Sequence, residues 1–124
     1  MHLIIADDNE YMRWLVRATL RSRFFDPIIE VSDGRELFRA LVHASLIRDA
    51  RDVLVITDIR MPGCSGLEII GLYDELDYHP TTVVMTSYPD AEARAATRQA
   101  GGVLIAKPFA MSELRRIVED AYPS

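Results

Sequence analysis

The sequence has a single cysteine and no long hydrophobic run. Cys64 cannot form a disulfide within the chain, which favours a reducing, cytoplasmic setting. No apolar run approaches the roughly 18 residues that span a bilayer. The opening apolar stretch meets Asp7 and Asp8 too early to serve as a signal peptide. We therefore expect a cytoplasmic protein without a membrane partner.

Basic residues are also in deficit, with 14 Lys and Arg against 19 Asp and Glu and a formal net charge of −5. This balance excludes a general electrostatic attraction to nucleic acid, so we expect no direct nucleic-acid partner. The 124 residues, 49% of them hydrophobic, are enough for one core without disulfides or a structural metal. We therefore expect a single domain over residues 1–124.

Five short apolar runs alternate with longer stretches of helical period. The runs cover residues 3–6, 28–31, 53–56, 82–85 and 103–106. Such alternation is typical of repeated βα units around a parallel sheet. Glu30 inside the second run favours an edge strand, whereas the continuous β-branched third run favours a central one. The sequence therefore predicts an α/β fold with a doubly wound sheet and helices on both faces.

Four of the predicted helices show apolar residues at helical spacing, and the remaining one is rich in alanine. The apolar groups are Met12, Leu15, Val16 and Leu20; Leu37, Phe38, Leu41 and Val42; Ile69, Leu72, Tyr73 and Leu76; and Leu114, Ile117, Val118 and Ala121. Asn9 or Asp8 can cap the first helix. The alanine-rich helix opens after Pro89 and stops at Gly101.

Polar side chains follow four of the predicted strands. The strands end at Asp7 and Asp8, at Asp58, at Thr86 and at Lys107. In open α/β sheets the crevice outside the carboxyl ends of the strands binds ligands. Two carboxylates about 4 Å apart repel by roughly 4 kcal/mol at an effective dielectric near 20, so three together need a cation. Carboxylate oxygens suit Mg²⁺, which keeps coordination places open for a phosphoryl group.

Lys107 is the only lysine, because 13 of the 14 basic residues are arginines. Its compact charge can bind a phosphoryl oxygen or pair with a carboxylate. The alternative is an ordinary surface lysine, which its position directly after a strand disfavours.

Over nearly its whole length the chain resembles the receiver domain of two-component response regulators. The resemblance is carried by four segments in this order, which are Ile5-Ala6-Asp7-Asp8, Asp58-Ile59-Arg60-Met61-Pro62-Gly63 with Gly66-Leu67-Glu68, Met85-Thr86-Ser87, and Lys107-Pro108-Phe109. Each segment alone is weak, but their order and separation are specific. The resemblance implies a flavodoxin-like sheet with strand order 2-1-3-4-5.

The resemblance also implies a chemistry. Asp58 is then the phosphoacceptor, which takes a phosphoryl group from a phosphohistidine of a sensor histidine kinase or phosphotransfer protein. Asp8, Asp58 and the backbone carbonyl of Arg60 are the implied Mg²⁺ ligands, with Asp7 holding the ion through water. A receiver catalyses its own Mg²⁺-dependent phosphorylation and dephosphorylation, and is in that sense not a conventional enzyme.

Two further residues receive roles from the resemblance. Thr86 donates its hydroxyl to the phosphoryl group and shifts inward, which switches the surface of the fourth helix, fifth strand and fifth helix. Lys107 neutralises charge on the phosphoryl oxygens, and its bond to Pro108 is cis in the family. In the family, the surface of the fourth helix, fifth strand and fifth helix often forms a homodimer.

The chain departs from the family pattern at the position three residues before Lys107. Leu104 stands where an aromatic residue is common, so an aromatic rotamer switch is not expected. Arg60 and Tyr88 occupy the two positions that flank the phosphoryl group, and we expect them to hinder attacking water.

Arg13, Arg17 and Arg21 form a basic stripe with a spacing of four residues. We interpret it as a solvated helix face, with docking of an acidic partner surface as the second interpretation.

Two other functions remain open from the residues alone. A Mg²⁺-dependent aspartyl phosphatase usually has a second acid two residues after the nucleophile, where this chain has Arg60. A receiver-like interaction module that works without phosphorylation would lack the acidic pair, the phosphoacceptor or the lysine, and all of these are present.

Overall fold

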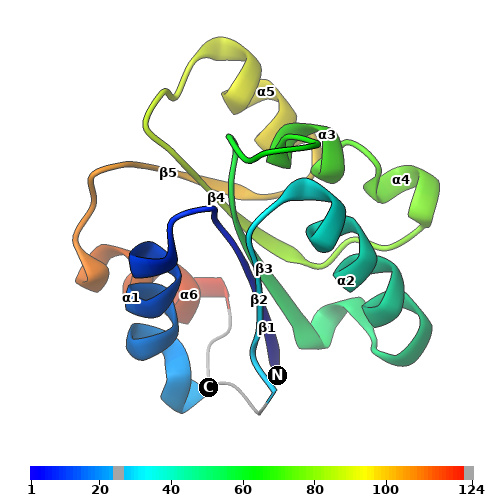
Figure 1. The fold of residues 1–124 in the computed structure, drawn as a ribbon, viewed down its shortest axis with the longest axis horizontal. Coiled ribbons are helices and arrows are strands. Elements are labelled where there is room, and N and C mark those ends of the chain that lie inside the picture. Colours follow the sequence, from blue (N-terminus) through cyan, green and yellow to red (C-terminus); the bar gives the residue numbers. More distant parts are fainter. Residues whose placement is uncertain (24–26, 122–124) are drawn as a thin grey trace.

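The five strands form one parallel sheet in the order β2-β1-β3-β4-β5, as seen in the computed structural model, which describes residues 1–23 and 27–121 (Figure 1). The strands are β1 (His2–Ala6), β2 (Ile29–Val31), β3 (Val53–Asp58), β4 (Thr81–Thr86) and β5 (Val103–Ala106). The predicted order is confirmed, with β2 at an edge and β3 in the centre. The edge position of β2 leaves Glu30 exposed, as its charge required.

Helices cover both faces of the sheet, which confirms the doubly wound prediction (Figure 1). They are α1 (Glu10–Leu20), α2 (Gly34–Ile47), α3 (Gly66–Ile70), α4 (Tyr73–Leu76), α5 (Ala91–Gln99) and α6 (Met111–Ala121), with short 3₁₀ turns at η1 (Arg21–Arg23) and η2 (Ala50–Asp52). The helices α1 and α6 lie together on one face, and α2, α3, α4 and α5 lie on the other. None of the helices in the described part of the chain is long and apolar enough to cross a membrane.

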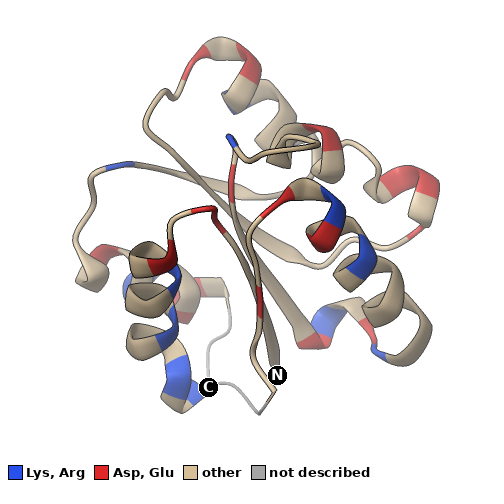
Figure 2. Ribbon diagram, viewed as in Figure 1, with Lys and Arg blue, Asp and Glu red and all other residues tan. Residues whose placement is uncertain are grey.

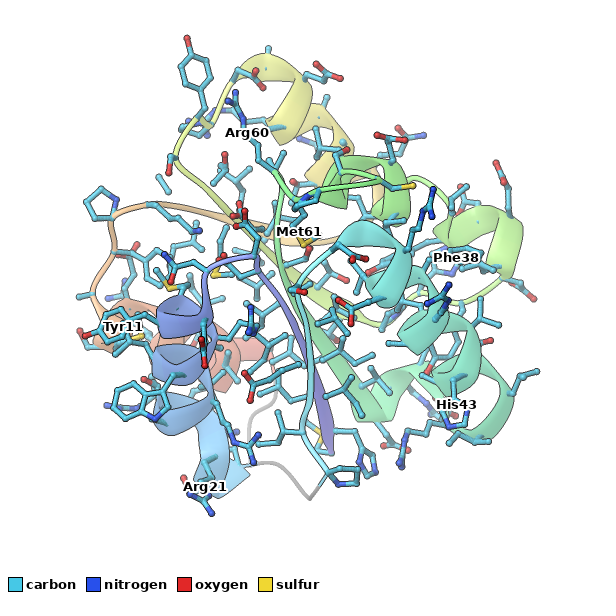
Figure 3. The ribbon with its side chains drawn as sticks, in the orientation of Figure 1. Tyr11, Arg21, Phe38, His43, Arg60 and Met61 are labelled. Atoms are coloured by element: carbon cyan, nitrogen blue, oxygen red, sulfur yellow. The ribbon has the colours of Figure 1, made fainter. Side chains whose placement is uncertain are left out.

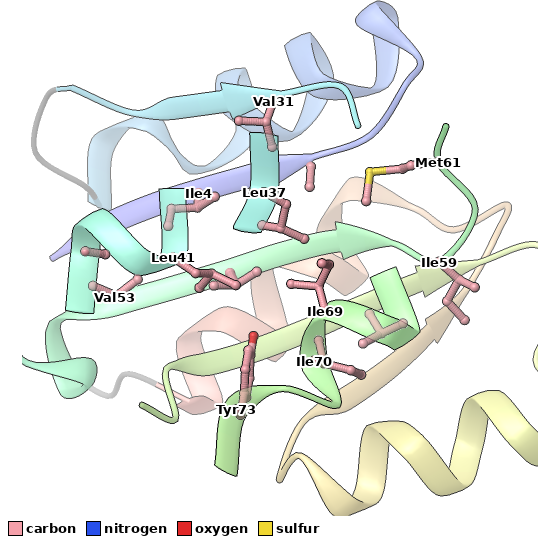
Figure 4. Packing of buried hydrophobic residues seen from close by; sticks show 14 of the residues in the cluster. Ile4, Val31, Leu37, Leu41, Val53, Ile59, Met61, Ile69, Ile70 and Tyr73 are labelled. Atoms are coloured by element: carbon pink, nitrogen blue, oxygen red, sulfur yellow. The ribbon is translucent and has the colours of Figure 1, made fainter. Parts of the chain in front are cut away.

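Two hydrophobic clusters hold these layers to the sheet. On one face, Leu37 and Leu41 of α2 and Ile69 of α3 pack in a cluster with Ile4 and Val55 of the central strands (Figure 4). The cluster on the other face joins α1 and α6 to the alternate residues of the same strands, and it includes Leu3, Ile5, Val16, Leu20, Leu54, Ile56, Leu114 and Val118. Because both faces are buried, the central strands appear in the sequence as continuous apolar runs.

Side-chain caps set the start of the helices that follow the strands. Asn9 Oδ1 accepts from the backbone N–H of Met12 at 3.0 Å, so Asn9 rather than Asp8 caps α1. Asp33 caps α2, and Asp90 caps α5 in the same way. With Asn9 as the cap, the side chain of Asp8 is not used by the helix.

The third predicted helix is wrong as a single element. Its apolar residues are divided between α3 and α4, which are separated by a turn at Gly71 and Leu72. Leu72 N donates to Ile69 O at 3.0 Å, which is the i to i+3 hydrogen bond of a tight turn and not the i to i+4 bond of an α-helix. Glycine is a poor helix former, and its presence in the stripe allows the break while Ile69 and Tyr73 both stay buried.

Candidate functional site

Acidic residues lie at the carboxyl ends of β1 and β3 (Figure 2), and three of their carboxylates meet there. One oxygen from each of Asp7, Asp8 and Asp58 lies within 4.8 Å of the others. Asp7 is fully buried, Asp58 is half-buried and Asp8 is exposed. The parallel pairing of β1 with β3 places Ala6 opposite Thr57. Asp7, which follows Ala6, and Asp58, which follows Thr57, therefore lie at the same end of the sheet. The predicted convergence of these three aspartates is therefore observed.

Lys107 joins the carboxylates from the end of β5. Its Nζ donates to Asp7 Oδ2 at 2.9 Å and to Asp58 Oδ2 at 3.2 Å. The side chain is only 16% exposed, which excludes the interpretation as an ordinary surface lysine. Its backbone N–H donates to Thr86 O at 2.7 Å, and the Lys107–Pro108 peptide is cis, as the resemblance implied. The lysine is thus fixed to the end of β4 by its backbone and to two carboxylates by its side chain.

The environment shifts the pKa values of this group. Burial raises the pKa of Asp58, and the charge of Asp7 adds to that rise while Lys107 opposes it. Burial alone would lower the pKa of Lys107, but its contacts with Asp7 and Asp58 outweigh burial and raise it. Lys107 therefore stays protonated at neutral pH and offsets only one of the negative charges. The cluster is still short of positive charge.

The donor set fits a hard divalent cation. Carboxylate oxygens from three residues are available at one place, and Asp8 presents its carboxylate to solvent. Mg²⁺ prefers one or two carboxylates and keeps several waters, so a shallow site with one exposed donor suits it. Arg60 N donates to Asp58 Oδ1 at 3.4 Å, which folds the loop after β3 back toward the carboxylates. The residues present therefore fit Mg²⁺.

Thr86 ends β4 beside the carboxylates. It is buried, and its Oγ1 accepts from the backbone N–H of Tyr88 at 2.9 Å. Its neighbour Met85 is the strand partner of Asp58, and Ile59 N donates to Met85 O at 3.2 Å. The hydroxyl of Thr86 therefore lies at the end of the strand that runs next to the one carrying Asp58, with its own proton still available for donation.

Gly66 supports the backbone of the site. It belongs to a segment that carries the family resemblance, but its structural role was not predicted from the sequence. Its N–H donates to Ile59 O at 2.8 Å, and a Cβ at this position would lie 2.2 Å from the backbone oxygen of Asp58. Such a distance is far inside van der Waals contact. Only glycine lets the start of α3 approach the backbone of Asp58 this closely.

Two large side chains form the rim of the site. The guanidinium of Arg60 lies over the ring of Tyr88, 5.6 Å from its centroid. Arg60, labelled in Figure 3, belongs to the loop after β3. Tyr88 belongs to the loop after β4. Both are exposed, and Tyr88 is 64% accessible. The structure thus brings together the two residues that were expected to flank the phosphoryl group.

The basic stripe on α1 is not a simple solvated face, so that interpretation is wrong for two of its three arginines. Arg13 Nη1 donates to the backbone oxygen of Asp7 at 2.7 Å, and its side chain is 17% exposed. Arg17 pairs with Glu30 of β2 at 2.9 Å, and Arg13 lies 3.5 Å from the same carboxylate. Only Arg21, which lies past α1 in η1, is exposed. The stripe joins α1 to the acidic edge strand.

Leu104 lies in β5, where many relatives were expected to have an aromatic residue. It is half-buried and packs against the cluster under α2, α3 and α5. A leucine held in this way has no ring to turn between inward and outward positions.

Residues 3–119 match the family model described as the response regulator receiver domain. A chemotaxis protein CheY homolog from Campylobacter jejuni is 31% identical over 124 residues, which cover 97% of this chain and 91% of that protein. Sporulation initiation phosphotransferase F of Bacillus subtilis is 25% identical over 125 residues, covering 98% of this chain and 93% of that protein.

A solved structure is also similar in fold. The CheY chain in a complex of CheX, CheY, BeF₃ and Mg²⁺ from Borrelia burgdorferi aligns with a TM-score of 0.83 and 18% identity. The alignment covers 100% of this chain and 90% of that chain. The family model matches almost the whole sequence, and the sheet has the strand order that the resemblance implied. The chain therefore belongs to the response regulator receiver domain family.

Proposed function

We propose that Asp58 accepts a phosphoryl group from a phosphohistidine of a sensor histidine kinase or phosphotransfer protein, in a Mg²⁺-dependent reaction. The observation that carries this proposal is the grouping of Asp7, Asp8 and Asp58 around Lys107 at one edge of the sheet. A buried lysine between two carboxylates, next to an exposed third, leaves negative charge that a divalent cation and a phosphoryl group can share.

In the proposed reaction an oxygen of Asp58 attacks phosphorus as the bond from phosphorus to the histidine nitrogen breaks. The electron pair of that bond leaves with the imidazole, and an aspartyl phosphate remains. Asp8, Asp58 and the carbonyl of Arg60 would hold Mg²⁺, with Asp7 holding it through water. When bound, the ion supplies positive charge to the phosphoryl oxygens. Lys107 would supply positive charge as well, and its hydrogen bond to Asp58 keeps the reacting carboxylate oriented.

Thr86 would transmit the change to the surface. In the structure its oxygen is engaged by the N–H of Tyr88. Donation of its hydroxyl to a phosphoryl oxygen would draw Thr86 inward and move the β4 to α5 loop with it. The surface formed by α5, β5 and α6 would then change for a partner or for a second copy of the chain. Because α3 and α4 together replace the third predicted helix, α5 and α6 correspond to the fourth and fifth predicted helices.

We also propose that residues 1–124 act as one receiver domain in the cytoplasm. The family match spans nearly all of the chain, and the CheY homolog is of similar length. The phosphotransferase relative and the CheY neighbour described with BeF₃ and Mg²⁺ support the assignment of phosphoryl chemistry.

The direct test is incubation with Mg²⁺ and acetyl phosphate, followed by intact-mass measurement. We expect the gain of one phosphoryl group in the wild type, its absence with EDTA, and its absence in Asp58→Asn. The control is Asp120→Asn, which removes an exposed carboxylate of α6 and should leave the gain unchanged. Since some receivers respond only to their kinase, a beryllofluoride titration followed by NMR provides the second measurement. No response in either assay would overturn the proposal and favour an interaction module that works without phosphorylation.

A further inference from the structure

A cavity lies at the opposite end of the sheet from the carboxylates. It has a volume of about 310 Å³ and is lined by described residues from β1, β2, α2 and the start of β3, namely His2, Leu3, Ile4, Pro27, Ile29, Arg39, Ala40, His43, Ala44, Arg48 and Val53. Val53 begins the strand that Asp58 ends. At about 3.3 Å a residue, five residues of strand separate the two sites by about 17 Å. The cavity is thus distinct from the proposed phosphorylation site.

The wall of the cavity is apolar. Ile29 of the edge strand, which is 39% exposed, forms its apolar floor together with Ala40 and Ala44, which give α2 only small side chains at this face. The small alanines leave the space open between the helix and the edge of the sheet. Pockets for small molecules begin at about 300 Å³, so the volume suffices for a short apolar ligand.

The polar side chains that line the cavity are all basic. They are Arg39, Arg48, His2 and His43, and no carboxylate is among the described lining residues. This gathering is unexpected in a chain with a formal net charge of −5. His43 lies on α2 toward the end of the sheet at which the chain begins (Figure 3), and Arg39 lies one helical turn before it. Both are exposed and stand at the mouth.

Inside the mouth, Arg48 and His2 contact each other. Arg48 Nη1 lies 2.5 Å from His2 Nε2, which holds the guanidinium against the start of β1. Burial lowers the pKa of His2, and the charge of Arg48 lowers it further, while Asp52, outside the lining, acts in the opposite direction. The positive charge is therefore concentrated on arginines, whose guanidinium groups bind carboxylates through two parallel hydrogen bonds.

We propose that this cavity binds a small amphipathic carboxylate, with its apolar chain against Ile29, Ala40 and Ala44 and its carboxylate at Arg39 and Arg48. The combination of an apolar floor with a cationic mouth fits an unbranched fatty acid of medium length. A fully polar anion would leave the floor uncovered, and a neutral apolar molecule would leave the arginines without a counter-charge.

The test is titration of the full chain with octanoate, followed by heteronuclear NMR. We expect shifts of the backbone signals of Ile29, Ala40 and Ala44 and of the imidazole signals of His2 and His43. Hexanoate, which is two methylenes shorter, should bind about fifteenfold more weakly, because each buried methylene contributes about fourfold to affinity. Octanamide, which lacks the charge, should also bind about tenfold more weakly.

Variants of α2 separate the cavity from non-specific surface binding. Arg39→Gln should weaken octanoate binding about tenfold, and Ala40→Leu should abolish it by filling the space. The matched control is Arg35→Gln, which removes the same charge from the same helix outside this cavity and should leave the affinity unchanged. Asp58→Asn and EDTA should also leave it unchanged, so the result is independent of the proposed phosphorylation.

Three results would overturn the proposal. The first is an absence of shifts in the cavity residues. The second is equal binding of octanoate and octanamide, which would show that the arginines take no part. The third is an equal loss of binding in Arg35→Gln and Arg39→Gln, which would show adsorption to the outside of α2.

Discussion

The guanidinium of Arg60 lies over the aromatic ring of Tyr88, and this contact joins the loop after β3 to the loop after β4 at the rim of the carboxylate cluster. Neither residue belongs to the cluster itself. Their backbones adjoin it, because Arg60 N donates to Asp58 Oδ1 and Tyr88 N donates to Thr86 Oγ1. We therefore expect the pair to hinder water that approaches an aspartyl phosphate. The contact makes the two side chains a pair, so replacing either one should release the other.

We expect Arg60→Ala and Tyr88→Ala each to speed loss of the phosphoryl group by about threefold, in line with a cation–π contact at an exposed site. The measurement is the decay of the phosphorylated mass after removal of the donor. The double variant should lose the phosphoryl group no faster than the faster single variant. The reason is that both single variants and the double variant lose the same contact between Arg60 and Tyr88. Arg35→Ala, which removes an exposed arginine from α2, is the control. Unchanged decay in both single variants would show that the rim does not control hydrolysis.

The raised pKa of Asp58 predicts that Asp58→Asn stabilises the fold. A carboxyl whose pKa is higher in the folded than in the unfolded state binds protons preferentially when folded. Its contribution to the free energy of unfolding is therefore greatest below its ordinary pKa of 3.8 and is lost as the pH rises through the folded value. At pH 7, in EDTA, we expect Asp58→Asn to melt about 3 °C higher than the wild type.

The same comparison at low pH provides the internal check. Below the ordinary pKa the wild-type carboxyl is neutral in both states, so the difference in Tm should shrink. Asp120→Asn, on the exposed side of α6, should melt like the wild type at both pH values. A lower Tm for Asp58→Asn at pH 7 would show that its contact with Lys107 outweighs burial.

Magnesium should stabilise the wild type through the carboxylate cluster. At an ion concentration tenfold above Kd, binding adds about 1.4 kcal/mol to the free energy of unfolding, or about 5 °C in Tm. Asp8→Asn removes the exposed donor without disturbing the Asn9 cap or the contacts of Lys107, and should remove most of this gain. Asp120→Asn should keep it. Equal gains in all three proteins, measured by differential scanning fluorimetry, would place the ion elsewhere.

The approach of α3 to Asp58 predicts a strong effect of a single methyl group. Gly66→Ala would place its Cβ 2.2 Å from Asp58 O, so the helix start must move. We expect a loss of about 2 kcal/mol in stability, together with slower phosphorylation because Asp58 is displaced. Gly71→Ala is the matched control, since its nearest neighbour is 3.3 Å away and alanine favours helix. A Gly66→Ala protein as stable and as reactive as the wild type would contradict the role of this contact.

The centre of the sheet could be predicted because its strands are buried on both faces. Residues 53–56 of β3 are apolar and buried throughout. The edge strand β5 could also be predicted, because residues 103–106 are all apolar although Val103 and Ala106 are exposed, and its predicted and observed bounds coincide. Edge and centre could also be separated, because the charge of Glu30 is incompatible with burial on both sides. The convergence of Asp7, Asp58 and Lys107 then followed from the parallel arrangement, because each of them stands at or directly after the end of a strand.

Other features depend on contacts that leave no periodic signal. Arg13 had the spacing of an exposed stripe, yet it bonds to the backbone of Asp7 and approaches Glu30 from a neighbouring element. The break at Gly71 is invisible to periodicity, because the apolar residues before and after it remain in phase. Gly66 was part of a motif, but only the three-dimensional approach to Asp58 shows why a side chain is excluded.

Lys107 carries the only primary amine on a side chain in the sequence, and that amine lies between Asp7 and Asp58. Isotopic dimethylation of lysine would therefore introduce a single side-chain resonance, located at the centre of the cluster. Its chemical shift and titration would follow the protonation of both carboxylates, the arrival of a cation and the formation of an acyl phosphate, each without a mutation. Because the sequence has one lysine, a lysine label would report on this site without a signal from any other lysine.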